Sequence, residues 1–248
     1  MLFDGKVLRN ERLNEEIFLL EIEKPEGFSS LPGQFVHLKV KDQAYPLLRR
    51  PISIYKEGKE SFTLLIKKVG KVSLQLSEAK PGLVLDILGP LGNSFPIERD
   101  KPILLVGGGI GVAPVSFLAS SLKEEGMNYE AYLGFREEPY AQEDFLYPVI
   151  HSEKRDAGFI TGPIEERLKK GDSPLIYACG PTPLLRAVKR LAEHYGSKAY
   201  LSLEEHMACG IGACVGCTVK TTRDEDFVYK KVCKDGPVFL AEEVLWDE

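Results

Sequence analysis

Four cysteines near the end of the chain carry the clearest chemical signal in the sequence. Their positions are Cys209, Cys214, Cys217 and Cys233. This C-x4-C-x2-C-x15-C spacing begins like that of plant-type [2Fe–2S] proteins, in which a distant segment supplies the fourth thiolate. Glycines lie between them, and glycine lets a loop wrap closely enough to bring backbone N–H groups to the cluster sulfurs. The pattern therefore predicts a [2Fe–2S] cluster bound by these four cysteines.

The spacing alone leaves two other uses of these cysteines open. A structural zinc site usually pairs two short C-x-x-C segments, whereas the second half here has one cysteine. Disulfides are disfavoured in the cytoplasm, where thiols stay reduced. We expect a cytoplasmic protein because the first residues, MLFDGKVLRNERL, lack the apolar segment of a signal peptide. His206 can replace a ligand, although a packing or solvated histidine is the simpler interpretation.

Two glycine-rich turns follow apolar runs in the middle of the chain. The run over residues 103–106 leads into GGGIG, and the run over 175–178 leads into CGP, each before a helical pattern. Ligands of open parallel sheets bind at the carboxyl ends of the strands, where glycine lets the backbone approach a phosphate. A tight turn without a ligand is the alternative, because strict G-x-G-x-x-G is not met. Two such turns favour a dinucleotide. The candidate contacts are Gly108, Gly109, Gly111, Cys179, Gly180 and Pro181.

Basic residues nearer the amino terminus indicate a second nucleotide. Arg49 and Arg50 begin an apolar run in LLRRPISI, and arginine binds phosphate through paired hydrogen bonds. A solvated surface pair is the alternative. Further on, KKVGKVS leads into a short helix expected from Ser73 to about Ala79, with Ser73 as a candidate N-cap. Two anion sites ahead of a nucleotide domain favour a flavin.

Three segments with different patterns must position these sites. Residues 1–98 contain short alternating apolar runs between turn residues, which predict an antiparallel β-barrel. Residues 99–199 alternate strand and helix patterns, which predict a doubly wound parallel sheet, with a helix over 143–149 and a strand at 159–160. Residues 200–248 form a small cysteine-containing unit. The expected fold class is therefore a multidomain protein with α+β and α/β parts.

The composition excludes several classes of protein. The chain has 248 residues, 44% of them hydrophobic and 28% charged, which is typical of a globular protein with well-formed cores. Its net charge of −5, without a long basic run, argues against nucleic acid as a partner. No stretch of about 18 apolar residues occurs, so we expect no membrane span.

Taken in order, these motifs resemble the ferredoxin reductase-like superfamily. More specifically, LLRRPISI, GPLGNSF, VGGGIGVAP, YACGPTPLL, EEHMACGIGACVGC and VCKDGPVF together resemble the electron-transfer subunit of class 1B dihydroorotate dehydrogenase, over essentially the whole chain. In place of the family's G-x-G-T, this sequence has GKVS, so Ser73 replaces threonine and Val72 replaces a glycine. The FAD contacts that the resemblance implies are Arg50, Pro51, Ile52, Ser53, Lys67, Lys68, Val69, Val72 and Ser73.

The resemblance also implies a function. Electrons would pass from dihydroorotate, through FMN in a separate catalytic subunit, across the cluster to FAD and NAD⁺, in pyrimidine biosynthesis. Two copies of each subunit would assemble, and apolar surface around Ile211 and Val215 would dock the partner. We expect no acid–base side chain in catalysis, because the cofactors carry the redox chemistry. The resemblance favours NAD over NADP, although Arg136 beside Glu137 leaves that choice open.

Two competing functions stay open. One is the flavin and iron–sulfur subunit of another NAD(P)H oxidoreductase, of the ferredoxin:NADP oxidoreductase or sulfhydrogenase type, which shares this architecture. The other is a zinc-stabilised binding module without flavin. The colour of the protein separates the second, because a flavin and cluster protein is brown and a zinc protein is colourless.

Overall fold

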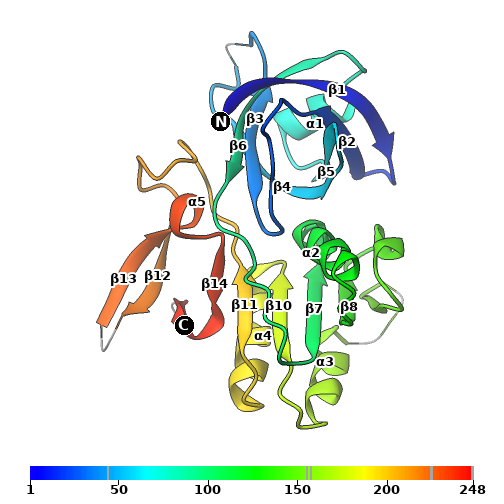
Figure 1. Ribbon diagram of the computed structural model, residues 1–248, viewed down its shortest axis with the longest axis vertical. Coiled ribbons are helices and arrows are strands. Elements are labelled where there is room, and N and C mark those ends of the chain that lie inside the picture. The colour runs from blue at the N-terminus through cyan, green and yellow to red at the C-terminus, as the bar shows by residue number, and fades with distance from the viewer. Residues whose placement is uncertain (44, 155, 157, 224–225, 247–248) are drawn as a thin grey trace.

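The computed structural model describes residues 1–248 apart from 44, 155, 157, 224–225 and 247–248. In the described part of the chain, the strands form a closed barrel, a six-stranded sheet and a three-stranded sheet. Figure 1 shows the barrel at one end of the long axis, the six-stranded sheet at the other end and the three-stranded sheet to one side. None of the helices described is both long and apolar enough to cross a membrane.

The barrel is closed and antiparallel, as the alternating runs predict, with strand order β1-β2-β5-β4-β3-β6. Apolar side chains from alternate strand positions fill its interior. Closure leaves no strand edge unpaired. The elements are β1 (Leu2–Arg12), β2 (Ile17–Glu23), β3 (Phe35–Val40), β4 (Arg50–Glu57), β5 (Ser61–Lys67), α1 (Lys71–Ser77) and β6 (Val84–Leu91).

The six-stranded sheet has the order β14-β11-β10-β7-β8-β9. Five strands are parallel, as expected, and β14 is antiparallel to β11 at one edge. Helix α2 covers one face, and α3 and α4 cover the other. The elements are β7 (Ile103–Gly108), η1 (Gly109–Gly111), α2 (Val112–Glu124), β8 (Glu130–Phe135), η2 (Gln142–Asp144), β9 (Val149–Ser152), α3 (Thr161–Leu168), β10 (Leu175–Cys179), α4 (Thr182–His194), β11 (Ala199–Ser202) and β14 (Val238–Leu240).

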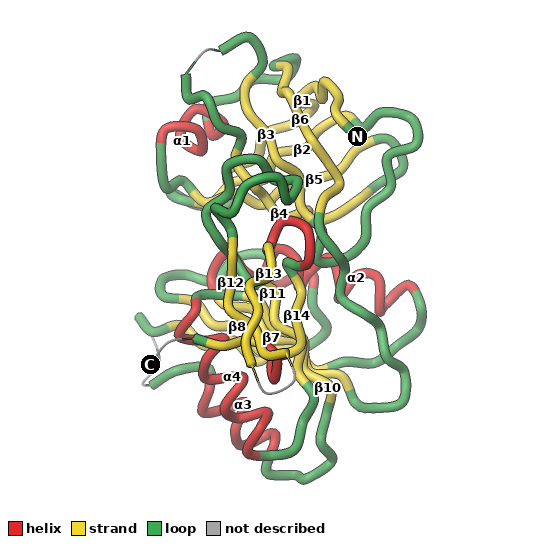
Figure 2. Tube along the Cα trace, turned by 90° about the vertical axis from the view of Figure 1, so that its left-hand side faces the viewer, coloured by secondary structure: helices red, strands yellow, loops and turns green. Residues whose placement is uncertain are grey.

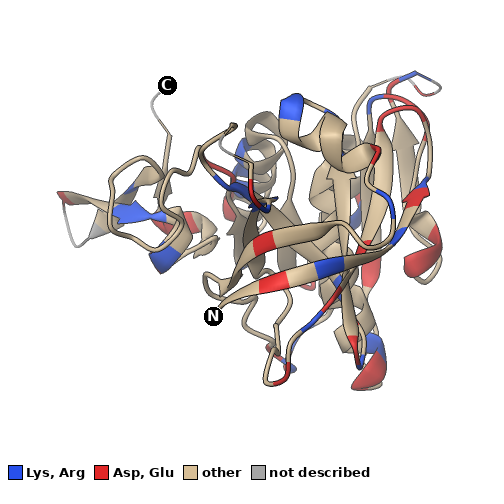
Figure 3. Cartoon of the chain, turned by 90° about the horizontal axis from the view of Figure 1, so that it is seen from above, with Lys and Arg blue, Asp and Glu red and all other residues tan. Residues whose placement is uncertain are grey.

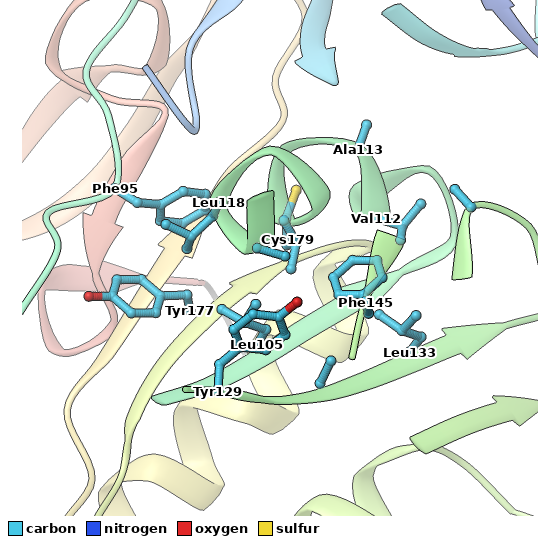
Figure 4. Packing of buried hydrophobic residues seen from close by; sticks show 14 of the residues in the cluster. Phe95, Leu105, Val112, Ala113, Leu118, Tyr129, Leu133, Phe145, Tyr177 and Cys179 are labelled. Carbon is cyan, nitrogen blue, oxygen red and sulfur yellow. The ribbon is translucent and has the colours of Figure 1, made fainter. Parts of the chain in front are cut away.

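The core beneath α2 is dense and continuous. Figure 4 shows Leu118 of α2 above Leu105 of β7, with Cys179 at the end of β10 beside them. Val112 and Leu118 are fully buried, and Tyr177 anchors the other side through its hydroxyl, which donates to the Pro96 carbonyl at 2.6 Å. The first turn of α2 is therefore held rigidly over the ends of β7 and β10.

Two expectations for this sheet are wrong. The helix expected over 143–149 is instead the short η2 followed by β9, which pairs with β8. Pro148 explains the error, because the residue before a proline is disfavoured in a helix. The strand expected at 159–160 does not form either. Ile160 instead packs its side chain against Gly134 and precedes α3.

The cysteine segment forms the third sheet and the loop above it. Its elements are β12 (Thr218–Arg223), β13 (Asp226–Lys231), α5 (Val232–Asp235), η3 (Ala241–Glu243) and β15 (Val244–Leu245). The sheet order is β13-β12-β15. Figure 2 shows the loop above β12 directly below the barrel. In Figure 3, both acidic and basic residues lie along the strand that begins near the N-terminus.

A buried carboxylate joins the barrel to the six-stranded sheet. Asp144 of η2 accepts hydrogen bonds from Tyr55 of β4 and Ser116 of α2, and it pairs with Lys56 of β4. Its side chain is only 7% exposed. Burial, followed by the hydrogen bond to Asp144, raises the pKa of Tyr55, so the phenol stays neutral and donates. These contacts hold β4 of the barrel against η2 and α2, which belong to the unit of the six-stranded sheet.

Replacing Asp144 with asparagine should destabilise the chain by about 1–3 kcal/mol, because the change removes the charge and brings an NH₂ group toward three donors. The free energy of unfolding in urea, followed by tyrosine fluorescence, measures the loss. Glu11→Gln is the matched control, since Glu11 pairs with Arg9 at the surface and should contribute about 0–1 kcal/mol. Equal losses in the two variants would show that Asp144 does not join the two units.

Candidate metal centre and cofactor cleft

The four predicted cluster cysteines lie together in one loop and the short helix α5. The Sγ atoms of Cys217 and Cys233 are 3.3 Å apart, and all four thiols are free. The N–H of Gly212 donates to the Cys233 sulfur at 3.1 Å, and the N–H of Cys214 donates to the Cys209 sulfur at 3.3 Å. Backbone donors of this kind stabilise thiolates, which is the form that iron binds.

The loop backbone and the thiol pKa values both fit a cluster. Gly210 and Gly212 have φ values of 72° and 80°, a region that side chains disfavour, so the glycines are required for this path. Hydrogen bonds from the backbone of Cys214 and Ile211 lower the pKa of Cys209 to about 6. Burial raises the pKa of Cys233 to about 12, and metal binding would replace that proton.

The cysteine spacing suits a [2Fe–2S] cluster better than a structural zinc site, which usually pairs two short C-x-x-C segments. Among the described residues, no three His, Cys, Asp or Glu side chains are grouped as a site for a single ion. Ile211 and Val215, at 56% and 72% exposure, confirm the expected apolar surface on this loop.

A cleft of about 570 Å³ lies between the barrel, the start of α2 and the segment that leads to the cysteines. This volume is in the range of cofactor sites. It combines cationic groups, which suit phosphates, with apolar walls, which suit an aromatic ring. Of the predicted flavin contacts, eight line it: Arg50, Pro51, Ile52, Ser53, Lys67, Val69, Val72 and Ser73.

The two neighbouring arginines have different partners in the structure. Arg49 donates three hydrogen bonds to Asp86 of β6, two from Nη2 at 2.7 and 2.8 Å and one from Nε at 3.1 Å, so it is held in a half-buried ion pair outside the cleft lining. Arg50 donates to the Leu48 carbonyl at 2.6 Å and lines the cleft. Lys68 is not among the lining residues, and its backbone N–H donates to the Glu16 carbonyl at 2.8 Å.

Helix α1 begins two residues earlier than expected, at Lys71 rather than Ser73. Ser73 is therefore the third residue of the helix, and the expectation that it is the N-cap is wrong. Its hydroxyl accepts from the N–H groups of Val69 and Gly70 at 2.9 and 3.0 Å. These bonds hold the preceding turn in place at the edge of the cleft.

The two glycine turns pack directly against each other. Strands β7 and β10 are neighbours, with Gly107 paired to Cys179. A Cβ atom at Gly111 would lie 2.5 Å from the carbonyl of Cys179 and 2.6 Å from the nitrogen of Gly180. Gly109, with φ of 54°, faces open space instead. Of the glycines in this turn, Gly111 therefore serves packing and Gly109 leaves room for a ligand.

Gly111→Ala should destabilise the chain by about 1–3 kcal/mol, because the methyl group meets backbone atoms that cannot rotate away. We expect slower reduction of bound flavin by NADH as well, since both turns must shift. Urea unfolding and stopped-flow absorbance measure the two effects. Gly162→Ala is the control, as its Cβ would meet nothing within 4 Å. If both variants behave alike, the turn contact is not the reason for glycine at 111.

Glu204 and its neighbours are cleft residues that sequence reasoning missed. The segment Ser202–Met207 lines the cleft, together with Ile110 of the glycine turn and Ala113 of α2. Glu204 is exposed, yet the protein atoms that surround its carboxyl group remove part of its hydration and raise its pKa. Burial, and then the charge of Glu204, raises the pKa of Cys179, which places these two groups near each other. The one signal in the sequence was that EEH immediately precedes the cysteine loop.

Two family models match the chain. Residues 204–245 match the iron-sulfur cluster binding domain of dihydroorotate dehydrogenase B, and residues 6–95 match the oxidoreductase FAD-binding domain. Each match covers one of the sites described above. The cysteine loop lies in the first match, and the barrel residues of the cleft lie in the second.

Similar structures share the fold. A solved structure of an NADH-dependent reduced ferredoxin-NADP oxidoreductase has a TM-score of 0.85 at 29% identity, and the match covers 98% of this chain and 90% of that one. Phthalate dioxygenase reductase has a TM-score of 0.65 at 20% identity, with 94% and 77% covered, which shows the fold alone. The ferredoxin reductase-like architecture expected from the sequence is therefore confirmed.

Curated relatives are similar over nearly all of the chain. The dihydroorotate dehydrogenase B (NAD(+)) electron transfer subunit of Caldanaerobacter subterraneus is 40% identical over 248 residues, which is 98% of both chains. The subunit of the same name from Geobacillus kaustophilus is 44% identical over 86% of each. Identity at this level over whole chains shows common descent. The chain thus belongs to the family of dihydroorotate dehydrogenase B (NAD(+)) electron transfer subunits.

Proposed function

We propose that this chain is the electron-transfer subunit of an NAD-dependent dihydroorotate dehydrogenase. It takes electrons from a catalytic subunit through a [2Fe–2S] cluster and FAD to NAD⁺, in the synthesis of UMP. One observation carries the proposal: Ser202–Met207 lines the cleft, and the first cluster cysteine, Cys209, follows two residues later. The flavin cleft and the metal centre therefore share one wall.

The side chains around the cleft would bind and orient the cofactors. When bound, FAD exchanges a hydride with the nicotinamide and single electrons with the cluster. Arg50 supplies a paired donor for the pyrophosphate, and Lys67 and Lys71 add positive charge at the cleft edge. The four thiolates hold the irons, and the N–H groups of Gly212 and Cys214 stabilise their charge.

The nicotinamide nucleotide would bind where the two glycine turns meet. Gly108 at the end of β7 and Gly111 of η1 lie beside Cys179, Gly180 and Pro181 at the end of β10, and Gly109 between them faces open space. Ile110 of the same turn lines the flavin cleft, which would bring the nicotinamide to the flavin. We propose NAD rather than NADP on the names of the relatives. Arg136, Glu137 and Glu138 are all exposed after β8.

Each of three segments of the chain would bind one cofactor. We assign residues 1–98 to FAD, 99–199 to NAD and 200–248 to the cluster. The barrel strands end at Leu91 and β7 begins at Ile103, which supports the first boundary. The second boundary is crossed by β14, which completes the sheet of the middle segment. The cluster segment is thereby tied to the NAD segment.

We propose an FMN-containing catalytic subunit as partner, in a cytoplasmic assembly of two copies of each chain. The relatives are named as electron transfer subunits, which supports a separate catalytic chain. Ile211 and Val215 supply exposed apolar surface on the cluster loop, where a partner must approach for electrons to pass. Their position beside the cysteines fits a docking role.

An anaerobic NADH titration of the purified chain tests the relay. We expect the flavin absorbance to bleach and a low-temperature EPR signal of a reduced [2Fe–2S] cluster to appear. Mixing with the catalytic subunit should then give NADH formation that depends on dihydroorotate. A colourless chain without iron would overturn the proposal.

A ferredoxin:NADP oxidoreductase subunit is the second candidate, favoured by the TM-score of 0.85 with a structure of that class. This candidate would be supported if the chain exchanged electrons with ferredoxin and NADPH. It would also require that the chain, mixed with the catalytic subunit, did not respond to dihydroorotate.

A further inference from the structure

One buried histidine of the flavin barrel is not used by the proposed relay. His37 lies on β3, between Pro51 of β4 and Leu88 of β6, and it is 1% exposed. Its neighbours Val36 and Leu38 belong to the barrel core. Successive side chains of a strand point to opposite faces, so His37 points out of the barrel. It is buried only because another part of the chain covers it.

The cluster loop is what covers it. A Cβ atom at Gly210 would lie 2.5 Å from Nδ1 of His37 and 3.2 Å from Cγ and Cε1. The imidazole edge therefore rests on the backbone of Gly210, the residue after the cluster cysteine Cys209. The backbone of Arg49, which precedes the cleft residue Arg50, also interacts with the ring, as does that of Cys209.

The ring is polar, and its polarity is unmet. Neither nitrogen makes a hydrogen bond of standard geometry to a described residue, and the backbone groups of Arg49 and Cys209 are the hydrogen-bonding groups that act on the ring. A buried polar group without a partner costs about 1–3 kcal/mol, so an apolar side chain would serve better if the position only filled space. We therefore expect the imidazole nitrogens of His37 to have a role, as a hydrogen-bond donor or acceptor toward the cluster loop.

We propose that His37 is a positioning residue of the [2Fe–2S] centre. Its imidazole packs on Gly210 and, when the cluster is bound, forms a hydrogen bond with the backbone at Cys209. In this way it fixes the Cys209 side of the cluster to the strands that carry the flavin. The inference rests on the proposed function, because it requires the cluster. Outer-sphere groups that orient metal ligands act in the same manner.

Two substitutions at His37 separate positioning from space filling. His37→Leu keeps much of the volume and removes the polar atoms, whereas His37→Gln keeps a donor and an acceptor. We expect His37→Leu to release iron to a chelator about 10- to 100-fold faster than the parent, with His37→Gln closer to the parent. Equal rates for the two variants would overturn the proposal. Leu38→Ala is the control, since Leu38 belongs to the barrel core and points to the face of β3 opposite His37.

A double-mutant cycle tests the contact between His37 and Gly210 and separates it from the backbone strain that any side chain at position 210 causes. Gly210→Ala is strained in any background, because φ is 72°. Beyond that strain, it should accelerate iron release more when His37 is present than when His37→Ala has removed the ring. Gly212→Ala is the matched control: it has the same backbone strain but meets Lys234, so it should show no coupling to His37. Absence of coupling at Gly210 would contradict the contact.

The iron content of the parent protein separates failure of the proposed function from failure of the positioning role. If it purifies without iron, the proposed function fails, whatever His37 does. If it carries the cluster and the His37 variants release iron at the parent rate, only the positioning role fails. Bound FAD and the midpoint potential of the cluster, measured by EPR-monitored titration, add readouts that do not depend on turnover.

Discussion

Replacing Cys217 with serine is expected to give a protein that purifies with FAD but with less than about a tenth of its iron. Cys217 is 1% exposed, and its sulfur lies 3.3 Å from that of Cys233. A hydroxyl is a far poorer ligand for iron than a thiolate, and the buried site offers no nearby replacement. Iron and acid-labile sulfide per FAD, with the visible spectrum, measure the loss. NADH should still bleach the flavin.

Cys179 provides the control for this result. It is equally buried, but it sits at the end of β10 in the core beneath α2 rather than with the cluster cysteines. Cys179→Ala should therefore keep its iron and its EPR signal. Loss of iron from both variants would indicate general unfolding. Full iron in Cys217→Ser would remove Cys217 from the ligand set and reopen the question of what the loop binds.

Replacing Arg50 with alanine is expected to weaken FAD binding by about 10- to 100-fold, which corresponds to the 1.5–3 kcal/mol of hydrogen bonds to a charged group. Arg50 lines the cleft from the first residue of β4, and its guanidinium suits a pyrophosphate better than any other side chain there. The recovery of flavin fluorescence on dilution gives the dissociation constant. Iron content should be unchanged, because the thiolates lie on another segment.

The adjacent arginine is a matched control. Arg49 has the same chemistry, but it is held by Asp86 and takes no part in lining the cleft. Arg49→Ala should leave the dissociation constant of FAD close to that of the parent protein. An equal effect of both substitutions would show that overall positive charge, rather than a specific contact, determines flavin affinity.

The sequence alone determined the features that depend on neighbouring residues. The alternating runs of residues 1–98 predict the barrel strands, because a half-buried strand must alternate. The cysteine spacing predicts the metal loop, because four thiolates must converge through a backbone that glycine makes flexible. The resemblance to reductase subunits, carried by short motifs, then implied a set of candidate flavin contacts, all of which except Lys68 line the cleft.

Local patterns failed where a single residue changed the balance. The stretch over 143–149 was expected to be helical, yet Pro148 disfavours the helical conformation at Tyr147, whose φ is 45°, and β8 was available for pairing with β9. Helix α1 began at Lys71 rather than Ser73, because the Ser73 hydroxyl bonds back to the turn. Such choices depend on competing contacts that the local pattern does not contain.

Only the tertiary structure decided which distant residues meet. Asp144 joins Tyr55 and Lys56 across 88 or 89 positions, and His37 meets Gly210 across a still longer span. The cleft wall at Glu204 arises because β11 ends beside the flavin barrel. These contacts follow from how the closed barrel packs on the six-stranded sheet. Packing between units is set by the summed fit of two surfaces, and no short stretch of sequence records that fit.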